Sequence, residues 1–212
     1  MYHEAQRALQ DRYGTRRLAD RLVSVIVHDT FTDEERAFIE ARDMLFLATV
    51  DGDGQPTVSY KGGAPGFVRV EDNELVVPCY DGNGMFLSTG NVAASARVGV
   101  LFIDFETPNR LRVDGVARLD DGAAKERFPD ALFLIRIRPA RIFVNCARYV
   151  HTYRRTAESR HVPGPDGGTT LAAWKRLDAV RDTLPDVDRA RAEAEGALSQ
   201  DEYHRMLARG ET

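Results

Sequence analysis

Three short segments carry side chains that could bind an anion. In the first, Ser59-Tyr60-Lys61-Gly62-Gly63, a hydroxyl, a phenol and an ammonium group come at the end of an expected strand, before two glycines. A lysine acts as a compact positive charge toward phosphate, and glycines let a ligand approach the backbone closely. The same residues also fit a strand that ends in a solvated lysine and a turn.

The second segment is Asp81-Gly82-Asn83-Gly84, which precedes an expected short helical run over residues 85–88. Backbone N–H groups at the start of that run could face an anion, although a plain Gly/Asn turn has the same sequence. Asn91 follows Gly90 and is expected either to cap the next turn or to contact a ligand.

The third segment is Arg110-Leu111-Arg112, within an expected strand. Side chains alternate along a strand, so both arginines should project to one face and Leu111 to the other. Two like charges on one face require an anionic partner, which could be a ligand or an acidic side chain such as Asp104 or Glu106.

Composition excludes several classes of protein. The chain has 212 residues, a net charge of -4, 43% hydrophobic and 29% charged residues, as expected of one soluble domain with terminal additions. An acidic total does not suit a nucleic-acid partner, and no apolar run is long enough to span a membrane. Residues 1–4 lack a basic run before an apolar core, and Cys79 and Cys146 form no C-x-x-C. We therefore expect a cytoplasmic protein with reduced thiols and no metal site.

The elements that must position these segments are mostly strands. Hydrophobic alternation and turn signals predict strands at 45–50, 57–60, 67–70, 75–77, 98–105, 111–119, 132–138 and 141–145, with Pro78 ending one strand and Pro139 separating the last two. Seven or so short strands at close spacing indicate a closed antiparallel barrel, because closure removes exposed edges.

Helices are expected at both ends of the chain. Residues 1–30 form a helical arm interrupted at Gly14, and Thr32 with Glu35 makes a capping box for a helix that runs to about Arg42. Residues 161–168 read as a loop, followed by two helical stripes, the second around a Ser199–Glu202 capping box. The stripes consist of Leu171, Trp174, Leu177 and Val180, and of Leu198, Tyr203, Met206 and Leu207. The expected organisation is an arm at 1–30, a barrel domain at 31–150, and a loop with a helical tail packed on the barrel at 151–212.

Several motifs in order resemble one family. They are Val-Ser-Tyr-Lys-Gly-Gly-x-Pro-Gly-Phe at 58–67, Gly-Asn at 82–83 and 90–91, Val-Leu-Phe-Ile-Asp-Phe at 100–105, and Arg-Leu-Arg-Val-x-Gly at 110–115. Together, over roughly residues 33–150, they resemble the flavin-nucleotide-binding branch of the pyridoxamine 5'-phosphate oxidase-like proteins. The resemblance implies a mainly β fold with flanking helices, an FMN-binding split β-barrel that forms a homodimer with FMN in the clefts between subunits.

The resemblance also implies roles for individual residues. Lys61 matches the phosphate-binding lysine, residues 82–84 match a second phosphate-contacting segment, and Arg110 is expected to reach the flavin ring of the partner subunit. A cation there would stabilise negative charge on reduced flavin. The full set expected to contact the cofactor is Val58, Ser59, Tyr60, Lys61, Gly82, Asn83, Gly84, Asn91, Arg110 and Arg112.

The chain departs from true pyridoxamine 5'-phosphate oxidases at two places. An arginine before the phosphate lysine is replaced by Pro56 or Thr57, and an Arg-Lys pair by Asn83-Gly84. The arginine-bearing C-terminal end of those enzymes has no match in residues 207–212. Oxidation of vitamin B6 is therefore not expected.

The expected function is an FMN-dependent oxidoreductase acting on a small substrate or a reduced nicotinamide. This chemistry needs no side-chain nucleophile, and the five histidines lie outside the motifs in no Ser/His/Asp or Cys/His arrangement. Two alternatives stay open: a non-catalytic flavin, deazaflavin or haem binding or sensing module, and a structural dimer with a degenerate site.

Overall fold

The chain folds into two compact units. The computed structural model describes residues 1–164 and 166–212, without the side chain of Ala124. The units are Met1–Thr156, which contains the whole sheet, and Ala157–Thr212, which is helical. The predicted packing of the C-terminal tail on the barrel stays a prediction.

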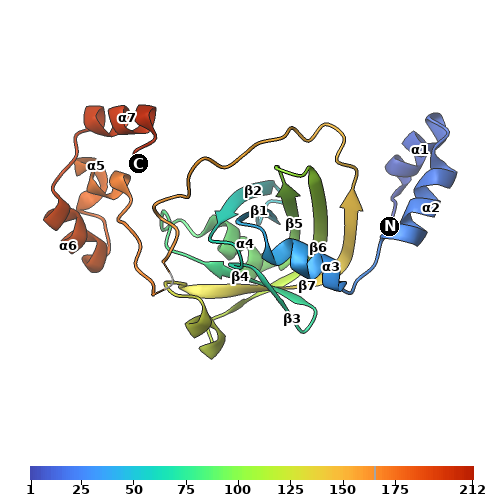
Figure 1. Ribbon diagram of the computed structural model, residues 1–212, viewed down its shortest axis with the longest axis horizontal. Helices are drawn as coiled ribbons and strands as arrows, with labels where there is room; N and C mark the ends of the chain where they lie inside the picture. The colour runs from blue at the N-terminus through green and yellow to red at the C-terminus, as the bar shows by residue number, and fades with distance from the viewer. Residues whose placement is uncertain (165) are drawn as a thin grey trace. The chain divides into compact units, whose positions relative to one another are not determined.

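The first unit is built around one seven-stranded antiparallel sheet (Figure 1). Its strands are β1 (Met44–Val50), β2 (Pro56–Gly62), β3 (Arg69–Glu71), β4 (Glu74–Cys79), β5 (Arg97–Asp104), β6 (Asn109–Asp120) and β7 (Phe133–Asn145). The strand order is β2-β1-β5-β6-β7-β4-β3. The prediction of a mainly β fold with flanking helices is confirmed.

The predicted full closure of the sheet into a barrel is not confirmed. No ladder between described residues joins β2 to β3, so the sheet curls but keeps two edge strands. Two features disfavour pairing of these edges with another strand: β3 has only three residues, and β2 begins with a proline. The edge position of β2 leaves one of its sides free of a neighbouring strand.

The core lies on the concave side of the sheet. Burial alternates along β1 and β5, so that Leu45, Leu47, Val100 and Phe102 face inward. Ile39 of α3 (Asp33–Glu40) and Val92 of α4 (Leu87–Ser95) belong to the same cluster. The alternate positions of the strands face outward, which is where several of the candidate site residues lie.

Two proline predictions are wrong for related reasons. β7 runs without interruption through Pro139, because the β6–β7 ladder has a bulge there: Asp114 pairs with Arg141 and Gly115 with Pro139, which leaves Ala140 of β7 without a partner. Pro78 lies within β4, paired with Leu134. β3 accompanies β4 only as far as Val76, so on that side of Pro78 no ladder requires an N–H group.

The helices of the first unit largely follow the prediction. The arm consists of α1 (Glu4–Arg12) and α2 (Arg16–Ile26), which are separated at Gly14, a residue with φ +65. The Thr32–Glu35 capping box is present, and α3 ends at Glu40, two residues before the predicted end. α4 is longer than the predicted run at 85–88 and places Asn91 inside the helix. A short 3-10 helix, η1 (Ala123–Arg127), follows β6.

The second unit has its own small core. It contains η2 (Ala173–Arg176), α5 (Asp178–Arg181), α6 (Asp186–Glu195) and α7 (Gln200–Arg209). Leu171, Leu184 and Ala192 form one buried cluster, and Ala173, Leu177 and Leu198 form another. The predicted Ser199–Glu202 capping box is confirmed. α6 was not predicted, because its sequence has few apolar residues to mark a stripe.

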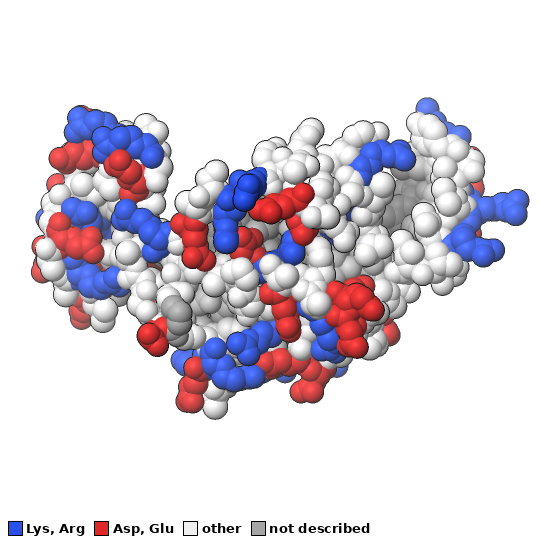
Figure 2. Space-filling view, in the orientation of Figure 1, with Lys and Arg blue, Asp and Glu red and all other residues white. Residues whose placement is uncertain are grey.

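Charged side chains of both signs are interspersed over the face shown in Figure 2. Opposite charges also pair in the first unit, where the mostly buried Arg136 contacts Asp120 at 2.6 Å, Glu71 at 3.6 Å and Glu74 at 3.9 Å. The side-chain hydrogen bond from Arg136 is the main cause that lowers the pKa of Asp120.

None of the described helices combines the length and apolar composition needed to cross a membrane.

Replacing Gly115 by alanine should destabilise the first unit. A Cβ at Gly115 would lie 2.4 Å from the Arg138 carbonyl oxygen, a backbone atom that cannot move without disturbing the β6–β7 ladder. We expect a loss of about 1–3 kcal/mol in the free energy of unfolding, measured by urea denaturation. Far-UV circular dichroism should follow the transition, since the single tryptophan, Trp174, lies in the second unit.

Gly90→Ala is the matched control. Gly90 lies within α4, and no atom lies within 4 Å of the position its Cβ would take. Alanine there should raise stability by about 0.5–1 kcal/mol, because glycine is a poor helix former. Equal effects of the two substitutions would contradict the importance of the bulge.

Candidate functional site

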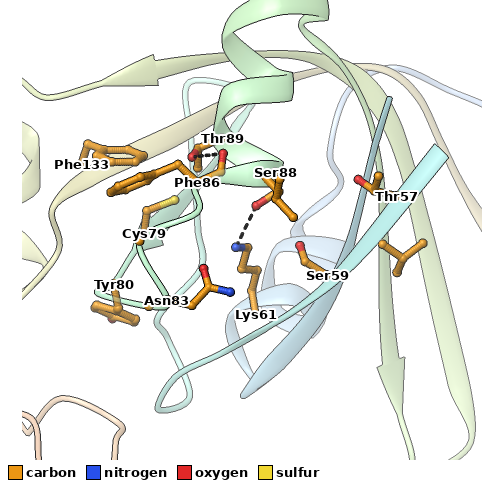
Figure 3. A pocket seen from close by; sticks show the side chains of 14 residues that line it. Thr57, Ser59, Lys61, Cys79, Tyr80, Asn83, Phe86, Ser88, Thr89 and Phe133 are labelled. Atoms are coloured by element: carbon orange, nitrogen blue, oxygen red, sulfur yellow. Dashed lines mark hydrogen bonds between the residues drawn. The ribbon is translucent and has the colours of Figure 1, made fainter. Parts of the chain in front are cut away.

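The main candidate site is a pocket of about 250 Å³, here called the Lys61 pocket (Figure 3). Its walls come from β2, from the loop between β4 and α4, and from the first turn of α4. The lining residues are Thr57, Val58, Ser59, Lys61, Cys79, Tyr80, Gly82, Asn83, Gly84, Phe86, Leu87, Ser88, Thr89 and Phe133. Six of the predicted cofactor contacts are therefore brought together: Val58, Ser59, Lys61, Gly82, Asn83 and Gly84.

Lys61 is the only charged residue in this lining. Its Nζ donates a hydrogen bond to Ser88 Oγ at 3.1 Å, as Figure 3 shows. Within the described ranges 1–164 and 166–212, no carboxylate forms an ion pair with it. An ammonium group held in a pocket without a counterion is suited to bind an anionic ligand.

The N-terminus of α4 adds further donors at the same place. The residue before the helix, Phe86, is in the left-handed region with φ 50, and no side chain caps the helix start. Leu87, Ser88 and Thr89 form the first turn and line the pocket. The first N–H groups of a helix have no partner inside the helix and carry its positive dipole end, so they favour an anion.

The loop before α4 leaves room for a ligand. No atom lies within 4 Å of the positions where Cβ atoms of Gly82 and Gly84 would stand, and Gly84 has φ +74. Asn83 Oδ1 accepts a hydrogen bond from the N–H of Met85 at 3.0 Å, which shapes the turn. The turn is therefore open toward the pocket rather than filled by its own side chains.

The opposite wall of the pocket is apolar. The rings of Phe86 and Phe133 lie 6.3 Å apart, and Cys79 lies buried beside them. Burial raises the pKa of the Cys79 thiol to about 11, against the opposing effect of the Lys61 charge. The thiol is thus a neutral packing group at ordinary pH.

A second hollow, the Arg110 groove, lies on the outer face of β1, β2, β5 and β6 and has a volume of about 420 Å³. Val58 lines both the groove and the Lys61 pocket. Arg110 and Arg112 both line the groove, while Leu111 is buried, so the predicted alternation is confirmed.

Arg110 has an unsatisfied donor in this groove. Its Nε is buried and has no hydrogen-bond partner among the described residues. Asp104, one of the two predicted acidic partners, forms an ion pair with Arg42 at 2.6 Å instead. Arg112 lies 3.8 Å from Asp114 and over the ring of Phe143 at 5.2 Å. A buried donor without a partner indicates an acceptor supplied from outside the chain.

Two predicted contacts lie elsewhere. Asn91 is inside α4 and caps nothing; its Nδ2 donates to Thr49 Oγ1 at 3.0 Å and to Thr57 Oγ1 at 3.4 Å. Tyr60 contacts Phe46 edge to face at 6.1 Å and lines a third pocket, not the Lys61 pocket.

Sequence reasoning missed the hydroxyls of Ser88 and Thr89. The available signal was a Ser-Thr pair directly after a glycine-rich turn, in the first turn of a helix. The pairing of Ser88 with Lys61 joins residues 27 positions apart, and no local pattern predicts that.

No group of three or more His, Cys, Asp or Glu side chains among the described residues could hold a metal ion.

Comparisons with known proteins identify the family of the chain. A family model described as pyridoxamine 5'-phosphate oxidase matches residues 31–146. No curated protein matches the chain. Since the family model covers more than half of its length, the chain belongs to the pyridoxamine 5'-phosphate oxidase family.

Several solved structures are also similar. HupZ from Group A Streptococcus is 21% identical, with 59% of this chain and 100% of that chain covered and a TM-score of 0.44. HutZ, the heme storage protein from Vibrio cholerae, is 24% identical, with 54% and 94% covered and a TM-score of 0.41. An FAD-binding protein from Mesorhizobium loti is 18% identical, with 57% and 99% covered and a TM-score of 0.38. With all three TM-scores below 0.5, family membership rests on the family model.

The two cysteines should differ sharply in reactivity. Cys146 is exposed, whereas Cys79 is buried with a pKa raised to about 11, so near pH 8 its thiolate fraction is about a hundredfold below that of an ordinary thiol. Iodoacetamide followed by mass spectrometry should modify Cys146 first. In Cys146→Ser, alkylation should be slow until denaturant exposes Cys79. Equal rates at the two thiols in the folded protein would contradict the burial of Cys79.

Proposed function

We propose that this protein binds FMN with its phosphate in the Lys61 pocket and acts, as a homodimer, as an FMN-dependent oxidoreductase on a small substrate or a reduced nicotinamide. The observation that carries the proposal is the meeting of Lys61 with the uncapped N-terminus of α4. The Nζ of Lys61 lies 3.1 Å from Ser88 Oγ, next to free helix N–H groups and an open glycine turn. Family membership supports the choice of a flavin nucleotide.

The donor set fits a phosphate monoester. Such a group carries about two negative charges near neutral pH and three strong acceptor oxygens. Lys61 supplies one positive charge, and a helix N-terminus is equivalent to roughly half a charge more. Ser88 Oγ accepts from Lys61 and keeps its own proton to donate to a further phosphate oxygen, whereas the hydroxyls of Ser59 and Thr89 donate to the carbonyl oxygens of Leu47 and Phe86.

The Arg110 groove fits the rest of the proposal. Val58 connects the groove with the Lys61 pocket, so a ligand anchored by its phosphate could extend from one hollow toward the other. The buried Nε of Arg110 needs an acceptor, which a flavin ring held by a second copy of the chain would offer. The outer face of the sheet also exposes Val58 by 70% and Val116 by 48%, apolar side chains that a second copy would cover.

FMN, when bound, supplies the electron-transfer chemistry, since a flavin takes up and releases hydride equivalents. The chain's own residues bind and orient. Lys61 and the first turn of α4 hold the phosphate, and the open turn at residues 82–84 allows close approach. Arg110 places positive charge where the ring would become negative. We assign no side chain as a proton donor or nucleophile.

Lys61→Ala should weaken FMN binding. Removing a charged hydrogen-bonding partner of phosphate costs about 1.5–3 kcal/mol, which corresponds to roughly 10- to 150-fold in the dissociation constant. Titration of the flavin-free protein, followed by quenching of flavin fluorescence, measures the change. Lys125→Ala is the matched control, because Lys125 is outside the pocket lining and its Nζ donates to the Leu132 carbonyl oxygen at 3.3 Å. Unchanged affinity in Lys61→Ala would refute the site, and a released haem in place of flavin would refute the cofactor.

The protein should sediment at twice its chain mass of 23.7 kDa. Val58→Asp should convert it to monomers, because a carboxylate would be buried at the centre of the covered face. Val187→Asp is the control: Val187 is 75% exposed in α6 of the other unit, and the dimer should persist. A wild-type protein that sediments as a monomer at micromolar concentration would overturn the dimer.

A further inference from the structure

A third hollow, the Tyr60 pocket, has a volume of about 540 Å³, within the range of small-molecule sites. It is formed by residues 41–44 before and at the start of β1, by the turn between β5 and β6, and by residues 153–155. Tyr60 lines it, whereas the adjacent Ser59 and Lys61 line the Lys61 pocket. The side chain of Tyr60 therefore points to the opposite face of β2 from those of Ser59 and Lys61.

Segment 153–155 is fixed against the rest of the first unit. The N–H of Tyr153 donates to the Phe105 carbonyl oxygen at 3.0 Å, and the two rings pack edge to face at 5.5 Å. Arg155 forms an ion pair with Asp43 at 2.8 Å. These contacts make the segment a wall of the pocket.

The charges of this lining are only partly compensated. Three arginines and three acidic residues contribute, and two pairs neutralise each other: Arg155 with Asp43 at 2.8 Å, and Arg42 with Asp104 at 2.6 Å. The remaining two are Arg154 and Glu106.

Arg154 and Glu106 form no ion pair with the described residues, not even with each other. They directly follow Tyr153 and Phe105, whose backbones are hydrogen-bonded to each other, and both line the pocket. One positive and one negative side chain thus line the same pocket without forming an ion pair with each other.

Tyr60 adds a neutral donor. Its hydroxyl has no hydrogen-bond partner in the part of the chain that the structure describes, and burial followed by the charge of Asp43 raises its pKa, so the proton stays on. Gly62 makes room for the ring, since a Cβ there would lie 2.8 Å from Tyr60 Cε1. Met44, Pro65 and Ile103 provide apolar surface.

We propose that the Tyr60 pocket binds a small zwitterion with an apolar or aromatic body, the chemistry of an amino acid. Arg154 and the Tyr60 hydroxyl bind the carboxylate, and Glu106 binds the ammonium group. The rings of Tyr60 and Tyr153 and the aliphatic side chains contact the body. The site uses no charged group of the Lys61 pocket and goes beyond the proposed flavin function.

Three ligands with the same ring test the charge pattern directly: L-phenylalanine, 3-phenylpropionate without the amine, and phenethylamine without the carboxylate. Isothermal titration calorimetry on the full chain as purified should give the tightest binding for L-phenylalanine. Each of the other two should bind at least about tenfold more weakly, because one charged contact is lost. No heat from any ligand at millimolar concentration, or equal affinity of all three, would overturn the proposal.

Two variants separate the contacts. Arg154→Gln should weaken binding of L-phenylalanine and 3-phenylpropionate but not of phenethylamine, and Glu106→Gln should weaken L-phenylalanine and phenethylamine but not 3-phenylpropionate. Arg148→Gln, at an exposed arginine outside the pocket, is the control. Variants that bind all three ligands like the wild type would refute the assignment. Since FMN affinity of Lys61→Ala is measured separately, failure of one site is distinguishable from failure of the other.

Discussion

A cluster of three hydrogen-bonded side chains, the buried Thr49 and the half-buried Thr57 and Asn91, holds α4 against the sheet, and the Lys61 pocket depends on it. Thr49 is 2% exposed, its hydroxyl lies 2.8 Å from that of Thr57, and Asn91 of α4 donates to both. Leaving a buried polar group without its partner costs about 1–3 kcal/mol of folding free energy. These hydrogen bonds therefore hold α4 in place. Through it, the uncapped start of α4 stays in front of Lys61. Asn91 therefore acts by positioning the helix.

The edge position of β2 explains why three hollows gather around one strand. Along β2, which pairs only with β1 among the described strands, Ser59 and Lys61 line the Lys61 pocket and Tyr60 lines the third pocket. Val58 lines both the Lys61 pocket and the Arg110 groove. An edge strand also exposes backbone groups that another chain or a ligand can use. The same constraint thus supports both the cofactor proposal and the dimer proposal.

The sequence was most informative where structure is local. Strand alternation, turns and the two Ser/Thr–Glu capping boxes were predicted because each depends on neighbouring residues. The positions of Pro78 and Pro139 inside strands could not be predicted, because a proline is accepted there only on account of distant segments. For Pro78 that segment is the short edge strand β3, and for Pro139 it is the bulge in the β6–β7 ladder next to Gly115. α4 was predicted too short because Thr89, Gly90, Asn91 and Val92 are weak helix formers, and packing against the sheet overrides that preference.

The same distinction holds for the site. Lys61 and residues 82–84 could be singled out from their types and spacing, whereas Ser88 and the wall formed by residues 153–155 depend on contacts between distant segments.

The central claim is that the Lys61 pocket binds a flavin by its phosphate. Paired titrations of the flavin-free wild-type protein with FMN and riboflavin test it most directly, since the two ligands differ only by that group. We predict that FMN binds at least about tenfold more tightly than riboflavin, because riboflavin lacks the charged contact with Lys61. Equal affinity for riboflavin would contradict it.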